Sequence, residues 1–108
     1  MNTRHRIEDM YTSEEDRGKM VECAELYDER AEILEEAAFC LECYASLEEE
    51  NLLINDERIA DDINEAYNSI KTLAESHRNT AKISRKMADS EHPVVTALES
   101  LLEVLKEK

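Results

Sequence analysis

The chain has 108 residues, of which 27 are Asp or Glu and 13 are Lys or Arg, so its formal net charge is −14. One Gly, one Pro, one Phe and no Trp exclude almost every β-rich architecture, because such folds need turn residues and aromatic side chains. The scarcity of Gly also excludes the glycine-rich loops that bind phosphates. A hydrophobic content of 42% is enough for a core. The composition therefore predicts a single all-α domain.

The acidic charge is concentrated in the first two thirds of the chain. Residues 8–65 hold 21 acidic and four basic residues, whereas residues 66–108 hold six acidic and seven basic ones. This charge opposes direct binding to nucleic acid or to an anionic membrane, because like charges repel. A protein with a basic surface is the partner that the charge favours. No apolar run approaches the roughly 18 residues of a membrane span and no signal-peptide pattern is present, so we expect a cytoplasmic protein.

Apolar periodicity predicts an N-terminal arm or short helix over residues 1–12 and a single helical bundle domain over residues 13–108. Thr12 and Ser13 offer N-caps for a long helix that runs to about Glu50. Its apolar seam alternates steps of four and three, and a second apolar stripe lies beside it. The seam contains Met20, Ala24, Tyr27, Ala31, Leu34, Ala38, Leu41 and Ala45, and the stripe contains Cys23, Leu26, Ile33, Ala37, Cys40, Tyr44 and Leu47.

A second long helix should follow a connection at residues 51–54 and reach about Ala88. Its predicted seam is Ile59, Ile63, Ala66, Ile70, Leu73, His77, Thr80, Ser84 and Met87, with Ala60, Tyr67, Ala74, Ala81 and Ala88 recurring every seven residues beside it. Ser90 and Pro93 then open a third helix, since Pro is tolerated in a first turn. Its apolar line runs through Val94, Leu98, Leu101 and Leu105.

The short connection makes the two long helices antiparallel neighbours, so we expect a long helical hairpin with a shorter C-terminal helix. In that register, five basic residues of the second helix (Lys71, Arg78, Lys82, Arg85 and Lys86) face acidic residues of the first and form salt bridges. The third helix can cover only about half of the hairpin. Oligomerisation, most simply a homodimer, would then cover the half nearer the connection through Cys40, Tyr44, Leu47, Ile59, Ile63 and Tyr67.

The chemical motifs do not assemble into a recognisable catalytic site, so we expect no enzyme activity, no metal and no cofactor. Cys40 and Cys43 form a C-x-x-C in the middle of a helix, without the second ligand pair that a zinc site needs. The interpretation we favour is a buried Cys40 and an incidental surface thiol at Cys43. Likewise, His77 falls on the seam and is expected to be a hydrogen-bonded core residue.

Four carboxylates at helical spacing leave one catalytic alternative open. Glu32 with Glu35, and Asp62 with Glu65, are similar to the paired carboxylates with which all-α nucleotide pyrophosphohydrolases hold magnesium, although the second pair is in the reverse order. A metal-dependent all-α nucleotide hydrolase is therefore an alternative function. A purely structural homo-oligomeric bundle is another.

The connection between the long helices carries the feature that points most directly to function. Residues 42–65, called the acidic tip below, contain nine acidic residues and only one base, Arg58. Apolar residues surrounded by charge of one sign are typical of a protein-binding surface. The equal alternative is that Leu52, Leu53 and Ile54 cap the core of the hairpin itself or pack in a dimer. The predicted partner-binding residues are Glu48, Glu49, Glu50, Leu52, Leu53, Ile54, Asp56, Glu57 and Asp61. We therefore expect a regulator or inhibitor that binds a basic protein surface. A protein that occupies the nucleic-acid channel of its partner, as DNA-mimicking phage inhibitors and anti-defence proteins do, is one specific form.

Overall fold

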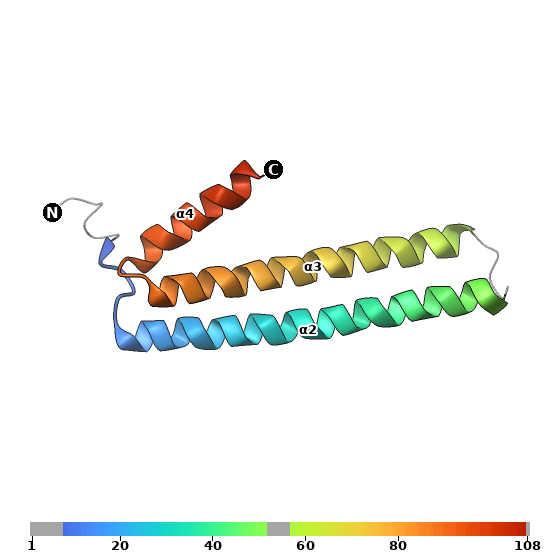
Figure 1. Ribbon diagram of the computed structural model, residues 1–108, viewed down its shortest axis with the longest axis horizontal. Coiled ribbons are helices and arrows are strands. Elements are labelled where there is room, and N and C mark those ends of the chain that lie inside the picture. Colours follow the sequence, from blue (N-terminus) through green and yellow to red (C-terminus); the bar gives the residue numbers. More distant parts are fainter. Residues whose placement is uncertain (1–7, 52–56, 108) are drawn as a thin grey trace. The chain divides into compact units, whose positions relative to one another are not determined.

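The computed structural model describes residues 8–51 and 57–107, and the side chains of residues 8–45 and 60–107. These residues form three helices and no strand: α2 Glu14–Asn51, α3 Glu57–Asp89 and α4 Pro93–Lys106 (Figure 1). The all-α prediction is therefore confirmed for the described residues. The predicted helix bounds also agree with the structure to within about three residues.

The chain divides into two compact units, to which α2 and α3 both contribute. The terminal unit consists of Met1–Asp28 and Asn79–Lys108, and the central unit consists of Glu29–Arg78. The terminal unit thus holds the beginning of α2, the end of α3 and the whole of α4.

The start of α2 follows its predicted capping pattern. The Ser13 hydroxyl accepts a hydrogen bond from the Asp16 backbone N–H at 3.2 Å and donates one to the Asp16 carboxylate at 2.8 Å. This reciprocal arrangement satisfies a backbone donor that the first helical turn leaves without an intrahelical acceptor. Glu14, Glu15 and Asp16 place negative charge at the positive end of the helix. Just before this cap, Tyr11 has a positive φ of 62°, which ends the preceding turn.

Within the terminal unit, Arg17 joins the start of α2 to the end of α3. Its Nη1 donates to the Ala88 carbonyl oxygen at 2.6 Å, and its Nε donates to the Thr12 carbonyl oxygen at 3.1 Å. Further along, Arg85 forms an ion pair with Asp28 at 2.5 Å. As the position on α2 rises from 17 to 28, the contacted position on α3 falls from 88 to 85. The two segments therefore run antiparallel within this unit.

Within the central unit, α2 and α3 also run antiparallel. Arg78 forms a bidentate pair with the Glu35 carboxylate, with N–O distances of 3.0 and 3.1 Å. Towards the other end of this unit, Leu41 and Ala45 line a hollow together with Ile63 and Tyr67. The predicted salt bridges between the long helices are thus present for Arg78 and, in the terminal unit, for Arg85.

The buried residues of the long helices are alanines. Ala24, Ala31 and Ala38 on α2 and Ala74 and Ala81 on α3 are between 0% and 3% exposed. On each helix these residues recur every seven positions, and a methyl side chain allows two helix backbones to approach closely.

This burial corrects the seam predicted for α3. Leu73, placed on the seam by its spacing, is 47% exposed, and Ala66 is exposed as well. Ala74 and Ala81, which the sequence pattern put beside the seam, are the residues that are buried. The helix is rotated so that small side chains face its neighbour, because alanines already line the matching face of α2.

The orientation of α4 also differs from the prediction. Pro93 at its start is fully buried, and Ser100 is 8% exposed. The line of leucines expected to cover the long helices remains exposed, with values of 51% for Leu98 and Leu101 and 66% for Leu105. Polar contacts of its first turn fix its start, since the Thr96 hydroxyl is hydrogen-bonded to that of Ser90 and the Thr96 N–H donates to the His92 carbonyl oxygen.

Candidate partner-binding surface

The structure describes only part of the acidic tip. The tip's apolar centre, Leu52, Leu53 and Ile54, and the adjacent Asp56 lie outside the described residues. Glu48, Glu49 and Glu50 belong to the last turns of α2 and Glu57 is the first residue of α3, but their side chains lie outside the description. Asp61 is exposed. The helical bounds therefore leave a five-residue connection, 52–56, between α2 and α3.

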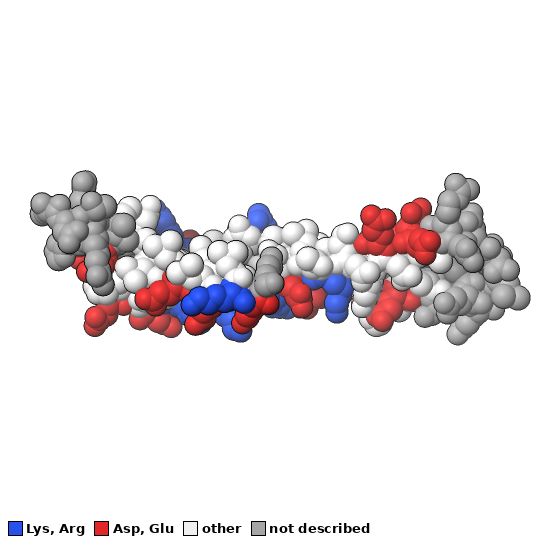
Figure 2. Space-filling model, turned by 90° about the horizontal axis from the view of Figure 1, so that it is seen from above, with Lys and Arg blue, Asp and Glu red and all other residues white. Residues whose placement is uncertain are grey.

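The acidic side chains of the tip that the structure describes are exposed. Glu42, Asp61, Asp62 and Glu65 all lie at the surface, and no Lys or Arg occurs among the tip side chains that the structure describes. In Figure 2, acidic side chains without basic ones lie beside the grey atoms at the right of the view. This part of the surface presents a negative field that reaches over about one Debye length, roughly 8 Å at physiological ionic strength.

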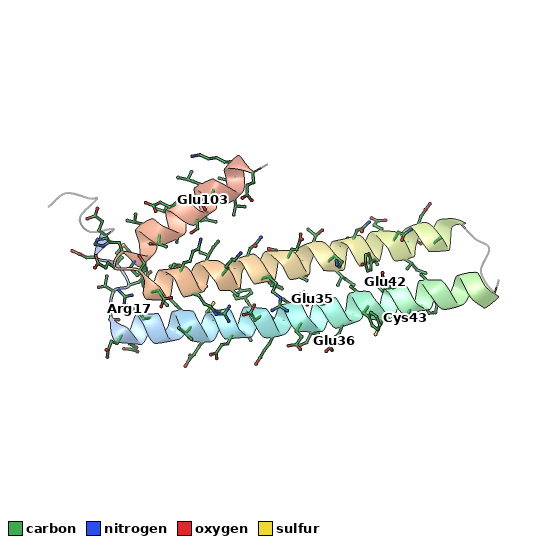
Figure 3. All side chains as sticks on the ribbon, in the orientation of Figure 1. Arg17, Glu35, Glu36, Glu42, Cys43 and Glu103 are labelled. Atoms are coloured by element: carbon green, nitrogen blue, oxygen red, sulfur yellow. The ribbon has the colours of Figure 1, made fainter. Side chains whose placement is uncertain are left out.

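Elsewhere on the long helices, two acids of α2 have basic partners on α3. Glu35 is held by Arg78 and Asp28 by Arg85, and both pairs join α2 to α3. Figure 3 shows that Glu35 and Glu42 lie on the side of α2 that faces α3, whereas Glu36 lies on the opposite side. An exposed pair contributes about 0–1 kcal/mol, so these pairs set register more than stability. Arg78 and Arg85, two of the five bases that could form an anion site on α3, are used in these pairs.

The six residues predicted for the oligomer interface fall into three groups. Cys40 is exposed and Tyr44 is 46% exposed, so both are accessible on α2. Ile63 and Tyr67 are half-buried and line the hollow of about 150 Å³ that they share with α2 residues of the central unit. The side chains of Leu47 and Ile59 lie outside the description.

The cysteine pair has a different environment from the one expected. Cys40 is exposed, so the expectation that it is a buried small hydrophobe was wrong; it lies on the stripe beside the seam, which α3 leaves uncovered. Cys43 is an exposed free thiol, as expected. Among the described residues, no three His, Cys, Asp or Glu side chains gather closely enough to hold a metal ion.

The four carboxylates of the hydrolase alternative have different surroundings and do not form one cluster. Glu35 is engaged by both Nε and Nη2 of Arg78, and Glu32 borders a surface hollow with Phe39 and Glu36. Asp62 and Glu65 are exposed on α3.

Two features of the surface were not predicted from the sequence. Phe39, the single Phe, is 64% exposed and lines a hollow of about 480 Å³ together with Glu32, Glu35, Glu36 and Cys40. Its position outside both predicted apolar stripes of α2 is the signal that could have found it. The other feature is Arg17, whose basic side chain in a strongly acidic helix start was a visible exception to the charge pattern.

Comparisons with known proteins add no family to these observations. No protein-family model matches the chain, and no curated protein or solved structure shows significant similarity to it. Within residues 8–51 and 57–107, no helix combines the length and the apolar composition that a membrane crossing requires.

Proposed function

We propose that this chain is a non-enzymatic, acidic helical interaction protein, a regulator or inhibitor that binds a basic surface of a partner protein. The observation that carries this proposal is the uneven placement of charge. The acidic tip holds nine acids against Arg58 alone, whereas two bases further along α3, Arg78 and Arg85, are paired with acids of α2. A partner that itself binds nucleic acid offers the basic surface that such a tip would occupy.

The acidic and the apolar residues of the tip have different roles in the proposed binding. The acids at Glu48–Glu50, Asp56, Glu57 and Asp61 attract the partner and orient it, because complementary charge raises the rate of encounter. Leu52, Leu53 and Ile54 supply the apolar centre, where a few residues usually carry most of the affinity.

The platform for this tip is a long antiparallel hairpin formed by α2 and α3. Its support comes from each unit separately, since Arg17 and Asp28 contact α3 in antiparallel order in one unit and Glu35 and Leu41 do so in the other. A five-residue connection is also short enough to make two helices antiparallel neighbours.

A matched pair of charge variants tests the proposal. The wild-type chain, immobilised at low salt, should retain from cell extract a basic protein that mass spectrometry identifies and that binds the purified chain directly. Glu49→Lys with Asp56→Lys should weaken that direct binding at least about tenfold. The control Glu22→Lys with Glu25→Lys changes the net charge equally at exposed positions far from the tip in sequence, and should keep most of the affinity. Equal loss in both variants would contradict the tip as the binding site.

A second candidate function is a structural homo-oligomer in which acids only provide solubility. The exposed apolar residues of α2 favour it, since Ile33 is 66% and Tyr44 is 46% exposed. In this case the chain self-associates, retains no other protein, and dissociates when Tyr44 is replaced by Glu. Sedimentation of the purified chain, read together with the capture experiment, separates the two functions.

A further inference from the structure

Cys40 and Cys43 form the only C-x-x-C of the chain, and both thiols are free and exposed. They belong to the central unit and lie one turn apart on α2. Ala38, which is 2% exposed, marks the side of α2 that is buried. Cys40 and Cys43 lie about 200° and 140° further around the helix axis. The two thiols therefore share the solvent side of α2.

The spacing of the two thiols does not suit a disulfide. Residues three apart on an intact α-helix have their Cβ atoms about 5–6 Å apart. A disulfide needs Cβ atoms about 3.5–4.5 Å apart, so closing one between Cys40 and Cys43 would distort α2. Both residues lie in the interior of a 38-residue helix, and not at the helix N-terminus where redox-active thiol pairs are found.

The same spacing suits a metal ion that binds two sulfur atoms. Metal–thiolate bonds are about 2.3 Å long, as at zinc, so an ion with two ligands in line holds its sulfurs about 4.6 Å apart. Thiols whose Cβ atoms are about 5–6 Å apart can reach this separation by rotation of the side chains alone. Both side chains are exposed, so no packing opposes that rotation.

The number of ligands determines which ion fits. Structural zinc needs four ligands and an iron–sulfur cluster needs four cysteines. Among the residues that the structure describes, no three His, Cys, Asp or Glu side chains are close enough to share an ion. Thiolates are soft ligands that favour Cu⁺, and this ion is stable with two sulfurs in a linear arrangement. The expectation of no metal depended on the four ligands of zinc and on a buried Cys40. The first does not apply to Cu⁺, and the second was wrong.

The surroundings of Cys40 attract a cation. Glu32 and Glu36 line the hollow that Cys40 borders, and Figure 3 shows Glu36 on the side of α2 away from α3. α2 contains no Lys or Arg after Arg30, so no basic residue of this part of the helix opposes a positive ion. A negative potential raises the local concentration of cations. Carboxylates are hard ligands, so they concentrate Cu⁺ without replacing the thiolates that bind it.

We propose that Cys40 and Cys43 form a binding site for one Cu⁺ ion, which bridges the two sulfur atoms on the solvent side of α2. Each thiol releases its proton as its sulfur bonds the ion, and no electron is transferred. Neither cysteine is among the predicted partner-binding residues, so the inference does not depend on the proposed function.

Anaerobic titration of the reduced full-length chain with Cu⁺, in competition with the chromogenic chelator bicinchoninate, tests the site. The wild-type chain should bind one ion at this site. Cys40→Ser and Cys43→Ser should each weaken that binding at least about tenfold, the smallest loss usual even for residues that only support a metal ligand. Cys23→Ser is the matched control and should keep the affinity, since Cys23 belongs to the terminal unit. Equal losses for all three variants, or wild-type binding no tighter than that of the Cys40→Ser, Cys43→Ser double variant, would overturn the inference.

A relocated thiol tests the spacing. Glu42→Cys with Cys43→Ser keeps the number of thiols, but residues two apart on a helix do not face each other. This variant should bind Cu⁺ as weakly as Cys43→Ser alone. X-ray absorption at the copper edge should show two sulfur neighbours, and circular dichroism should show unchanged helicity on binding. Tight binding by the relocated variant, a third sulfur neighbour or a loss of helicity would contradict the proposed site.

Discussion

Arg17 satisfies backbone groups at both the start of α2 and the end of α3. The Ala88 carbonyl belongs to the last turn of α3, where no intrahelical N–H is available to it, and a cation is favourable at that end of a helix. Arg17→Ala should therefore lower the free energy of unfolding by about 1–2 kcal/mol, which corresponds to a fall in Tm of about 5–10 °C. Thermal unfolding followed by circular dichroism measures the effect.

Lys19 provides the matched control for Arg17. Its contact with Glu15 spans 3.5 Å, and the two side chains are 69% and 82% exposed. Such a pair contributes little, so Lys19→Ala should change the Tm by less than about 3 °C. Equal losses for the two variants would mean that Arg17 acts through general charge and not through its two carbonyl contacts.

Tyr11 occupies a backbone conformation that glycine adopts at lower cost. Its φ is 62°, and its side chain is 51% exposed, so little packing holds it there. An L-residue in this region costs about 1 kcal/mol or more. Gly avoids that cost, but its greater conformational freedom in the unfolded chain cancels part of the gain in stability. Tyr11→Gly should raise the free energy of unfolding by about 0.5 kcal/mol. Met10→Gly, at a position with ordinary φ, should lower it, and denaturant titration distinguishes the two signs.

At the scale of the helices, the alanines determine how α2 and α3 pack. Ala31 is 0% exposed, whereas Ala37, six residues later on the same helix, is exposed. Leucine at position 31 has to displace the facing helix, and overpacking of this kind costs about 1–3 kcal/mol. Ala31→Leu should therefore lower the Tm by several degrees, while Ala37→Leu should leave it nearly unchanged. If Ala31→Leu left the Tm unchanged, the two helices would not be in close contact at this position.

The start of each helix could be predicted from neighbouring residues in the sequence, whereas the face that each helix buries could not. Ser13 and Pro93 identified helix starts because caps depend on neighbouring residues. Salt bridges between basic residues of α3 and acidic residues of α2 followed from an antiparallel arrangement, but the individual pairs of Arg78 with Glu35 and Arg85 with Asp28 did not. The burial of Ala74 in place of Leu73 depends on which side of α3 meets the alanines of α2. A periodicity that treats all apolar residues alike cannot distinguish these two faces.

At the scale of the whole molecule, charge could be assigned from the sequence, but the exposure of apolar faces could not. The acidic tip is visible in the order of residues alone, and its described acidic residues are exposed as expected. The outward leucines of α4 could not be predicted, because the pattern of an amphipathic helix is the same whether its apolar face meets its own chain or another one. Cys40 was assigned to the interior for the same reason and is exposed.

Two kinds of variant in the acidic tip should change different rate constants of partner binding: charge reversal should change association, and loss of an apolar side chain should change dissociation. Charge reversal at Glu49 and Asp56 removes long-range attraction, so it should slow association with the captured partner about tenfold or more at low salt and much less at high salt. Leu53→Ser leaves the charge unchanged and removes apolar contact, so it should mainly speed dissociation. Surface plasmon resonance at two salt concentrations measures both rates. Since neither change touches a described core residue, the Tm of both variants should stay within a few degrees of the wild type. If both variants bind with wild-type rates, the tip is a solvated connection and the partner contacts another surface of the chain.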